Sequence, residues 1–266
     1  GRYLGHTAAE SSRNIFLRFE QYAFYQDMNR RMEMARLIVR GKIDNQVALI
    51  RQHRFSDGYD WQADVKRMEE LKATLPERDT PNEILGVEGI CSNIYFHAFG
   101  HMLHGDFAFS GRNRRPPKDP VNVIISLAYT FLTKEMVSAL DAESYETYLG
   151  FLHGIRYGRK SLALDMIEQF RQPVVDRLVL LLFAKRMLGR YDFEFPEEGG
   201  VVLSEDGFKK FCREYERWMN GTNSAAGDSF RARIRAQVAA LKKSICDDVP
   251  YHPYIWKESK DVSGEL

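Results

Sequence analysis

The chain has few cysteines and almost no net charge, and both shortages exclude classes of protein. Cys91, Cys212 and Cys246 are its only cysteines among 266 residues, and no two of them form a CxxC pair. This pattern argues against a disulfide framework and against a zinc site built from thiolates, and it suits a reducing cytoplasm. Because 38 Lys and Arg face 37 Asp and Glu, a nucleic-acid surface would need unevenly placed charge.

Several common motifs and any long uncharged apolar run are also missing. The sequence has no GxxxxGK[ST] and no GxGxxG after a strand, so P-loop nucleotide hydrolysis and Rossmann-type hydride transfer are poorly supported. Charges interrupt the runs LALDMIEQF and VVDRLVLLLFA, so we expect neither to span a bilayer, and no signal peptide precedes them. The sequence predicts a cytoplasmic protein. Since it begins GRYLGHTAAE without Met, we expect a domain or linker upstream.

Helical periodicity dominates the first half of the chain. Apolar residues return every three or four positions within 13–54, which predicts two helices broken near Gly41, and the same spacing continues in a third helix from Trp61. TPNE at 80–83 is a capping box with proline at the first helical position, so a further helix begins there. DP at 119–120 begins the next one after a loop rich in proline and arginine.

The second half predicts more helices and one small hairpin. We expect Ser161 to cap a long apolar helix that is kinked or restarted at Pro173. FEFPEEGGVVL at 193–203 indicates a hairpin, and Ser204 is expected to cap the helix after it. The fold class is therefore mainly α, a multi-helix domain with one small β-hairpin. Its expected units are a helical domain at 1–220 and a C-terminal helix and tail at 221–266, packed on the domain or flexible from it.

Three carboxylates lie among apolar residues, where burying charge is costly without compensation. Glu88 shares one helical face with Ile84 and Tyr95, which indicates either a site residue or a buried Glu paired with an Arg. Asp165 and Glu168 are spaced i, i+3, so both project from one face and repel unless a cation or proton lies between them. The alternative for this pair is a narrow solvent-facing stripe that also holds Arg171 and Gln172.

His153, in the apolar run YLGFLHG, would complete a set of one imidazole and two or three carboxylates. A lone histidine in such a run is more often a satisfied core residue, so the prediction depends on the carboxylates. Oxygen-rich ligation with one nitrogen suits Mg²⁺ or Mn²⁺. A rival site is FHAFGHMLH, where His97, His101 and His104 share one helical face but lack the Glu of a HExxH motif. A zinc site there is the alternative to histidines that line a core edge or groove.

Basic residues are clustered despite the neutral total. One loop holds Arg112, Arg114, Arg115 and Lys118; a second cluster, Arg156, Arg159 and Lys160, follows His153; a third is Arg231, Arg233 and Arg235. Cations beside a carboxylate metal site are what a phosphodiester substrate requires. The alternative is that these loops are merely solvated, which is the better interpretation for the third cluster alone.

Five stretches resemble the helical catalytic domain of CRISPR-associated protein one, the spacer-acquisition integrase and endonuclease family. They are KIDNQ at 42–46, GVEGICSNIYF around Glu88, GRNRRPPKDPVNVIISLAYTFL at 111–132, GFLHGIRYGRKSLALDMIEQFRQPVVDR at 150–177 and GGVVLSEDGFKKF at 199–211. The likeness covers about residues 1–220, in order and with fitting spacing. It is therefore more specific than any single motif.

The resemblance implies a catalytic Mg²⁺ or Mn²⁺ site made by Glu88, His153 and Glu168, with Asp165 as an adjacent acid. Many relatives have Asp where this chain has Glu168, which leaves open which of the two acids is the direct ligand. It also implies an N-terminal β domain and a homodimer in the full-length protein, and CRISPR-associated protein two as a partner.

The implied activity is insertion of short DNA into repeat arrays by phosphoryl transfer, with prespacer and repeat DNA as partners and no membrane. We expect Arg112, Arg114, Arg115, Arg159 and Lys160 to hold the DNA backbone. The alternative function is a non-catalytic helical module that binds DNA or protein.

Overall fold

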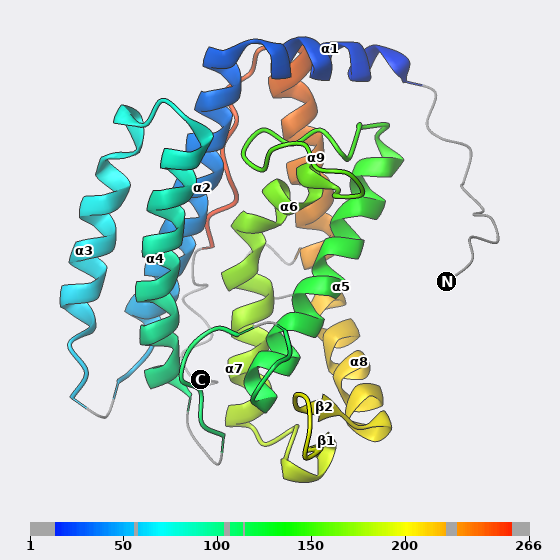
Figure 1. Cartoon of the computed structure of the whole chain (residues 1–266). Coiled ribbons are helices and arrows are strands. Elements are labelled where there is room, and N and C mark those ends of the chain that lie inside the picture. The colour runs from blue at the N-terminus through cyan, green and yellow to red at the C-terminus, as the bar shows by residue number, and fades with distance from the viewer. Residues whose placement is uncertain (1–13, 56–57, 104–106, 114, 222–227, 257–266) are drawn as a thin grey trace.

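The computed structural model describes residues 14–55, 58–103, 107–113, 115–221 and 228–256. Within them the chain is mainly helical, as the sequence predicts, with a single two-stranded antiparallel sheet (Figure 1). The elements are α1 (Ile15–Gln26), α2 (Met28–Gln52), α3 (Trp61–Ala73), α4 (Pro81–Met102), α5 (Pro120–Ala142), α6 (Ser161–Ile167), α7 (Arg177–Ala184), β1 (Phe193–Glu194), β2 (Val202–Leu203), α8 (Glu205–Asn220) and α9 (Phe230–Cys246).

Local capping signals begin the helices where the sequence predicts. The Thr80 hydroxyl accepts from the Glu83 amide at 3.3 Å, and the Glu83 carboxylate accepts from the Thr80 amide at 3.0 Å. Asp119 caps α5 by accepting from the Asn122 amide at 2.8 Å. Ser204 caps α8 in the same way. These starts depend on a few neighbouring residues, which is why sequence alone finds them.

Two local expectations are wrong. The break between α1 and α2 lies at Asp27, which caps α2, and Gly41 lies inside α2. A Cβ on Gly41 would lie 2.5 Å from Cβ of Pro253, so this glycine serves the close approach of the C-terminal tail and not a turn. Ser161 does not cap α6; it is the first helical residue, and its hydroxyl donates to the Gly154 carbonyl at 3.1 Å.

The helices enclose one hydrophobic core. α2 packs against α3 and α4, and α5 packs against α6, α7 and α9. α1 lies across one end of the molecule, in contact with α2 and α9, while α8 and the hairpin lie at the other end (Figure 1). Buried side chains from all of these helices form the core. This arrangement brings the middle of α2, the middle of α4 and the end of α6 together.

The chain between α6 and α7 is irregular, as the proline at 173 predicts. A 3-10 turn, Glu168–Phe170, follows α6, and a π-helical stretch, Arg171–Asp176, leads into α7. Every residue in these two stretches except Arg171 is buried. The irregular segment contacts α2, so it presents Glu168 toward that helix.

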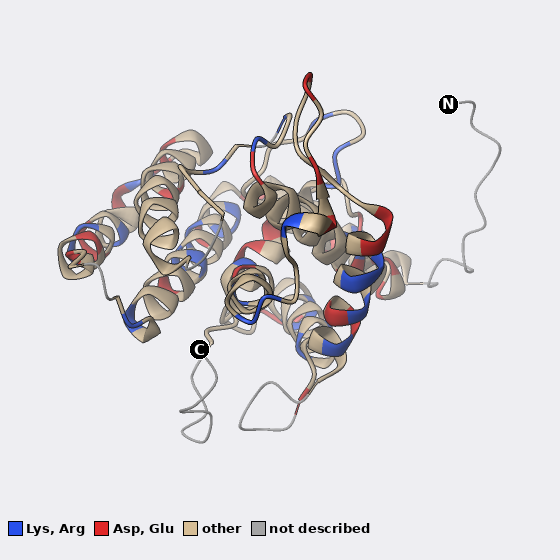
Figure 2. Ribbon diagram, turned by 90° about the horizontal axis from the view of Figure 1, so that it is seen from below, with Lys and Arg blue, Asp and Glu red and all other residues tan. Residues whose placement is uncertain are grey.

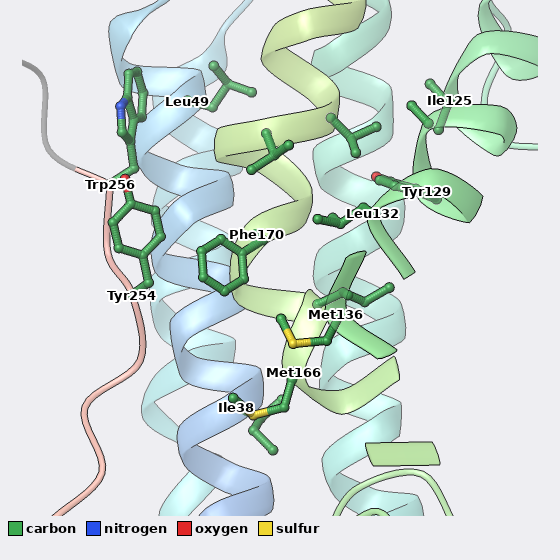
Figure 3. Packing of buried hydrophobic residues seen from close by; sticks show 14 of the residues in the cluster. Ile38, Leu49, Ile125, Tyr129, Leu132, Met136, Met166, Phe170, Tyr254 and Trp256 are labelled. Atoms are coloured by element: carbon green, nitrogen blue, oxygen red, sulfur yellow. The ribbon is translucent and has the colours of Figure 1, made fainter. Parts of the chain in front are cut away.

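The tail after α9 packs along α2 through its aromatic side chains (Figure 3). Tyr251, Tyr254 and Trp256 are buried, and the Tyr254 ring stacks on Phe170 with 5.2 Å between centroids. The Asn45 side chain fixes the tail to the irregular segment, because its amide donates to the carbonyls of Gln169 and Tyr254, each at 2.8 Å.

α5 is long and apolar enough, by length and composition alone, to cross a membrane. In the structure α5 buries one side, including Ile124, Leu132 and Met136, against α6, α7 and α9. A core helix has the same composition, so this feature carries no argument for a bilayer.

Candidate active site

Glu88 and Glu168 come from different helices and meet at the ammonium of Lys42. Lys42 lies on α2, Glu88 on α4, and Glu168 in the turn after α6. The Lys42 Nζ donates to Glu88 Oε1 and lies 2.7 Å from Glu168 Oε2. Glu88 Oε1 also accepts from the Ser92 hydroxyl at 2.8 Å. The two glutamates that sequence reasoning singled out are thus joined through a cation.

Glu168 is held as an anion in a buried place. Its side chain is 4% exposed, and its Oε2 accepts from Nε of Arg171 at 2.9 Å. Burial would raise the pKa of this carboxyl, but the charges of Arg171 and Lys42 and their hydrogen bonds lower it to about 2. Glu168 is therefore ionised throughout the physiological range.

Asp165 holds the loop that carries His153. Its Oδ2 accepts from the backbone amides of Phe151 and Leu152 at 2.6 and 3.0 Å. Its Oδ1 accepts from the backbone amide of His153 at 3.0 Å and lies 2.6 Å from that residue's Nδ1. Each carboxylate oxygen has about two lone pairs, so these four contacts use the acceptor capacity of Asp165.

Gly150 allows this close approach. A Cβ at this position would lie 2.7 Å from Oδ2 of Asp165 and 2.8 Å from the carbonyl carbon of Ser161. Both distances are shorter than real Cβ contacts, and Asp165 and Ser161 are fully buried and have little room to move. The run that ends at His153 therefore needs glycine here for a packing reason.

The orientation of the His153 ring follows from Asp165. Because the carboxylate accepts, Nδ1 carries the proton and Nε2 presents its lone pair. Burial lowers the pKa of His153, but the hydrogen bond and charge of Asp165, with the charge of Glu168, raise it overall. Glu168 follows Asp165 by three residues, about one helical turn, so the ring that Asp165 holds lies near the Glu88–Lys42–Glu168 group.

This arrangement fits a divalent cation. Lys42 stands between the two carboxylates, and the imidazole near them is oriented by a carboxylate, as imidazole ligands are in many metal sites. As the side chains are placed here, no set of three or more His, Cys, Asp or Glu in the described residues is close enough to form a complete ligand group. Two carboxylates and one imidazole suit Mg²⁺ or Mn²⁺.

The rival histidines line a separate groove. His101 stacks on Tyr59 with 4.1 Å between ring centroids, and His97 is 66% exposed at its side chain, with Nδ1 3.7 Å from Asp64. Both line a groove of about 530 Å³ between α4 and the segment 109–112. His104 lies outside the described residues, so the predicted three-histidine set has two members here.

The basic residues expected to bind DNA differ in their surroundings. Arg115 is exposed. Arg112 is partly buried and donates to the Asn122 side chain at 2.6 Å and to Ser126 at 3.0 Å. Arg159 donates to the Gly154 carbonyl and to the Ser161 hydroxyl, and Lys160 lies 3.5 Å from Asp141. Arg114 lies outside the described residues. Lys and Arg are interspersed with Asp and Glu over the molecule (Figure 2).

Sequence reasoning from single residues missed Lys42 and Arg171. Lys42 lies in KIDNQ, a stretch used only for the resemblance. In the structure this lysine is 7% exposed on an apolar helix face, and a lysine so buried needs an anion beside it. Arg171 was assigned only to a possible solvent-facing stripe. The i, i+3 spacing from Glu168 is the feature that could have identified it as the carboxylate's partner.

Asp176 is a further buried carboxylate, and it shares Tyr129 as a neighbour with Arg171. Asp176 accepts from the hydroxyls of Tyr95 and Tyr129, each at 2.7 Å. Burial raises the pKa of Asp176 to about 6, although these two hydrogen bonds act to lower it. The Arg171 guanidinium lies over the Tyr129 ring, 4.4 Å from its centroid. The hydroxyl network therefore supports the arginine that pairs with Glu168.

Comparison with known proteins decides the family. The model of the family described as CRISPR associated protein Cas1 matches residues 1–217. The chain belongs to the Cas1 family. The predicted resemblance is thereby confirmed, and the match spans all three elements that bring Lys42, Glu88 and Glu168 together.

Relatives of known name are similar over nearly the whole chain. A CRISPR-associated endonuclease Cas1 of Thermus thermophilus is 34% identical over 96% of this chain and 76% of its own length. A Cas4/Cas1 fusion of Rhodospirillum rubrum is 34% identical over 95% of this chain but 45% of its own length. The chain thus spans three quarters of the first relative and less than half of the second.

Solved structures show the same fold. A Cas1 protein from Thermotoga maritima superposes with a TM-score of 0.80 at 26% identity and covers 97% of this chain and 78% of its own. A chain of a partial Cas6-RT-Cas1–Cas2 complex gives a TM-score of 0.82 at 25% identity, with 98% and 79% covered. A casposase bound to integration product, at 24% identity and a TM-score of 0.81, shares the fold.

Proposed function

We propose that this chain is the helical catalytic part of a DNA endonuclease and integrase that acts in CRISPR spacer acquisition. Membership of the Cas1 family supports the reaction class. One observation supports assigning the site to particular residues. Glu88 and Glu168 meet at one buried cation, near an imidazole that Asp165 holds.

Glu88, Glu168 and His153 are the proposed ligands of Mg²⁺ or Mn²⁺. Asp165 orients the His153 ring and is not a ligand, because its oxygens already accept four hydrogen bonds. Under this assignment Glu168, and not Asp165, is the acid that faces the metal. The carboxylate of Glu168 reaches Lys42 on α2, whereas Asp165 accepts from the backbone amides of the loop before α6.

The bound ion would supply Lewis-acid stabilisation of charge on the attacked phosphate and would favour the ionised form of the attacking hydroxyl. The protein residues supply binding and orientation. Arg171 and Lys42 keep Glu168 ionised, and Asp165 fixes which nitrogen of His153 is presented. The fold keeps Glu168 almost free of solvent, which strengthens every charge interaction there.

The DNA backbone is proposed to contact the basic loops on either side of this site. Arg115, Arg159 and Lys160 are the described candidates, and Arg112 serves at least to hold the loop onto α5. Because such contacts release counterions, replacing Arg115 by Ala should weaken DNA binding uniformly across sequences and lower the salt slope by about one.

We further propose the Cas2 protein, prespacer DNA and repeat DNA as partners, and a homodimer for the full-length protein. Solved structures of this fold include a partial Cas6-RT-Cas1–Cas2 complex and a casposase bound to integration product. This part of the proposal depends on likeness to those assemblies.

The test replaces each of the three proposed ligands in turn. Glu88→Gln, Glu168→Gln and His153→Ala should each abolish Mn²⁺-dependent DNA cleavage and strand transfer and remove Mn²⁺ binding measured by electron paramagnetic resonance. Glu70→Gln, at an exposed position on α3, is the control and should behave as the wild type. Full activity in all three ligand variants would sink the assignment.

The alternative function remains a non-catalytic helical module that binds DNA or protein. Thermal unfolding with added metal separates the two. Retained DNA binding, with no stabilisation by Mn²⁺ or Mg²⁺ up to millimolar concentration, would favour the module.

A further inference from the structure

Lys42 is almost fully buried and is paired with two carboxylates, which is unusual for a lysine. Its side chain is 8% exposed, and its ammonium contacts the carboxylates of Glu88 and Glu168. Lysine loses much of its rotamer entropy when it is fixed and is almost never fully buried unless it is paired. Its place in the middle of α2 is therefore explained by the two anions that it joins.

The charges at this point are already balanced. Two carboxylates, Glu88 and Glu168, face two cations, Lys42 and Arg171. A divalent ion added among them would give the group an excess of two positive charges in a place with little solvent. Like charges a few ångströms apart repel strongly in such surroundings, so the ion and the ammonium compete for the same carboxylate oxygens.

We propose that Lys42 is an internal counter-ion that holds Glu88 and Glu168 in the metal-free protein and must withdraw before a divalent ion binds between them. This inference rests on the proposed function. Lys42 then sets the metal affinity of the site: it stabilises the metal-free form and weakens metal binding by the work of breaking its two ion pairs. Its flexible four-carbon stem permits the withdrawal without movement of α2.

The opposite role is a fixed positioning residue that holds both glutamates ready for the metal. The two roles predict opposite changes in metal affinity when Lys42 is replaced. A counter-ion that must leave weakens metal binding, so its removal tightens the binding. A fixed positioning residue improves metal binding, so its removal loosens the binding.

The experiment measures Mn²⁺ binding by titration calorimetry on metal-free protein without DNA. Lys42→Met should tighten binding by at least about tenfold, the scale expected for a close ion pair that no longer has to be broken. Lys42→Arg keeps the charge and should not tighten it. If the Met variant does not fold, Lys42→Gln gives the same comparison.

Lys72 provides the matched control. Its ammonium also joins two carboxylates, lying 2.7 Å from Asp44 on α2 and in contact with Glu69 on α3, and neither carboxylate is a proposed metal ligand. Lys72→Met should leave Mn²⁺ affinity unchanged. Melting temperature in EDTA should fall in both Met variants, but the stabilisation by Mn²⁺ should grow only in Lys42→Met.

Equal or weaker Mn²⁺ binding by Lys42→Met overturns the proposal. Glu168→Gln distinguishes this failure from a failure of the proposed function. If Glu168→Gln loses Mn²⁺ binding while Lys42→Met is not tighter, only the role of Lys42 is wrong. If Glu168→Gln binds Mn²⁺ as the wild type does, the metal site itself is wrong.

Discussion

Replacing Asp165 by Asn tests the link between the buried loop anchor and the active site. The change keeps the size of the side chain but turns one acceptor oxygen into a donor nitrogen. Asp165 is fully buried and accepts from three backbone amides and from the His153 ring. Asn can satisfy about two of these four donors, whichever way its amide is turned.

The expected cost follows from the donors left without an acceptor. Each buried unsatisfied group costs about 1–3 kcal/mol, so two of them predict a loss of about 2–6 kcal/mol in the free energy of unfolding. For a chain of this size each kcal/mol lowers the melting temperature by roughly 2–4 °C. Because the orientation of His153 is also lost, metal affinity or activity should fall by about 10- to 100-fold.

Urea unfolding in EDTA measures the loss in the free energy of unfolding, and Mn²⁺ titration of the folded variant measures the loss in metal affinity. Asp141→Asn is the control, because this residue is half exposed and lies 3.5 Å from Lys160 in a surface pair worth about 1 kcal/mol or less. Wild-type stability and wild-type Mn²⁺ affinity in Asp165→Asn would refute the reasoning.

Three further changes test separate parts of the structure. Gly150→Ala adds a methyl group 2.7 Å from a buried carboxylate oxygen and should cost about 1–3 kcal/mol in urea unfolding. Gly154→Ala meets nothing within 4 Å and should cost much less; equal effects would contradict the packing argument. Asn45→Asp removes the amide that donates to two backbone carbonyls and should speed proteolysis of the C-terminal tail; unchanged protection would show that the tail is held by its aromatics alone. Burial raises the pKa of Asp176 to about 6 from 3.8, so the folded state binds the extra proton and gains stability as pH falls through 6 toward 4. Asp176→Asn should remove that gain, and identical pH slopes of the urea midpoint for variant and wild type would count against it.

Helix starts were predictable because each depends on three or four neighbouring residues. The capping box at Thr80 and the cap at Ser204 are of this kind. Gly41 shows where such rules fail. It resembles a helix stop in sequence, but its reason lies in a contact with Pro253, more than 200 residues away. Sequence patterns contain no information on which distant segment will press against a glycine.

The candidate site was predictable as a set of residues but not as a set of roles. Spacing pointed to Glu88, His153, Asp165 and Glu168, and their chemistry pointed to a divalent ion. Only the structure distinguishes Asp165 from Glu168. Asp165 accepts from the backbone of the loop that carries His153, and Glu168 reaches Lys42 and Arg171. Both side chains leave nearly the same helix face, so sequence spacing alone cannot separate an orienting acid from a ligand.

The most direct test of the central claim is the anomalous density of Mn²⁺ in crystals of this protein. We expect one peak in contact with the carboxylates of Glu88 and Glu168 and with Nε2 of His153. Asp165 should keep its backbone hydrogen bonds, and the Lys42 ammonium should lie away from the ion. A peak bound by Asp165, or a peak at His97 and His101 with none at Glu168, would contradict the account.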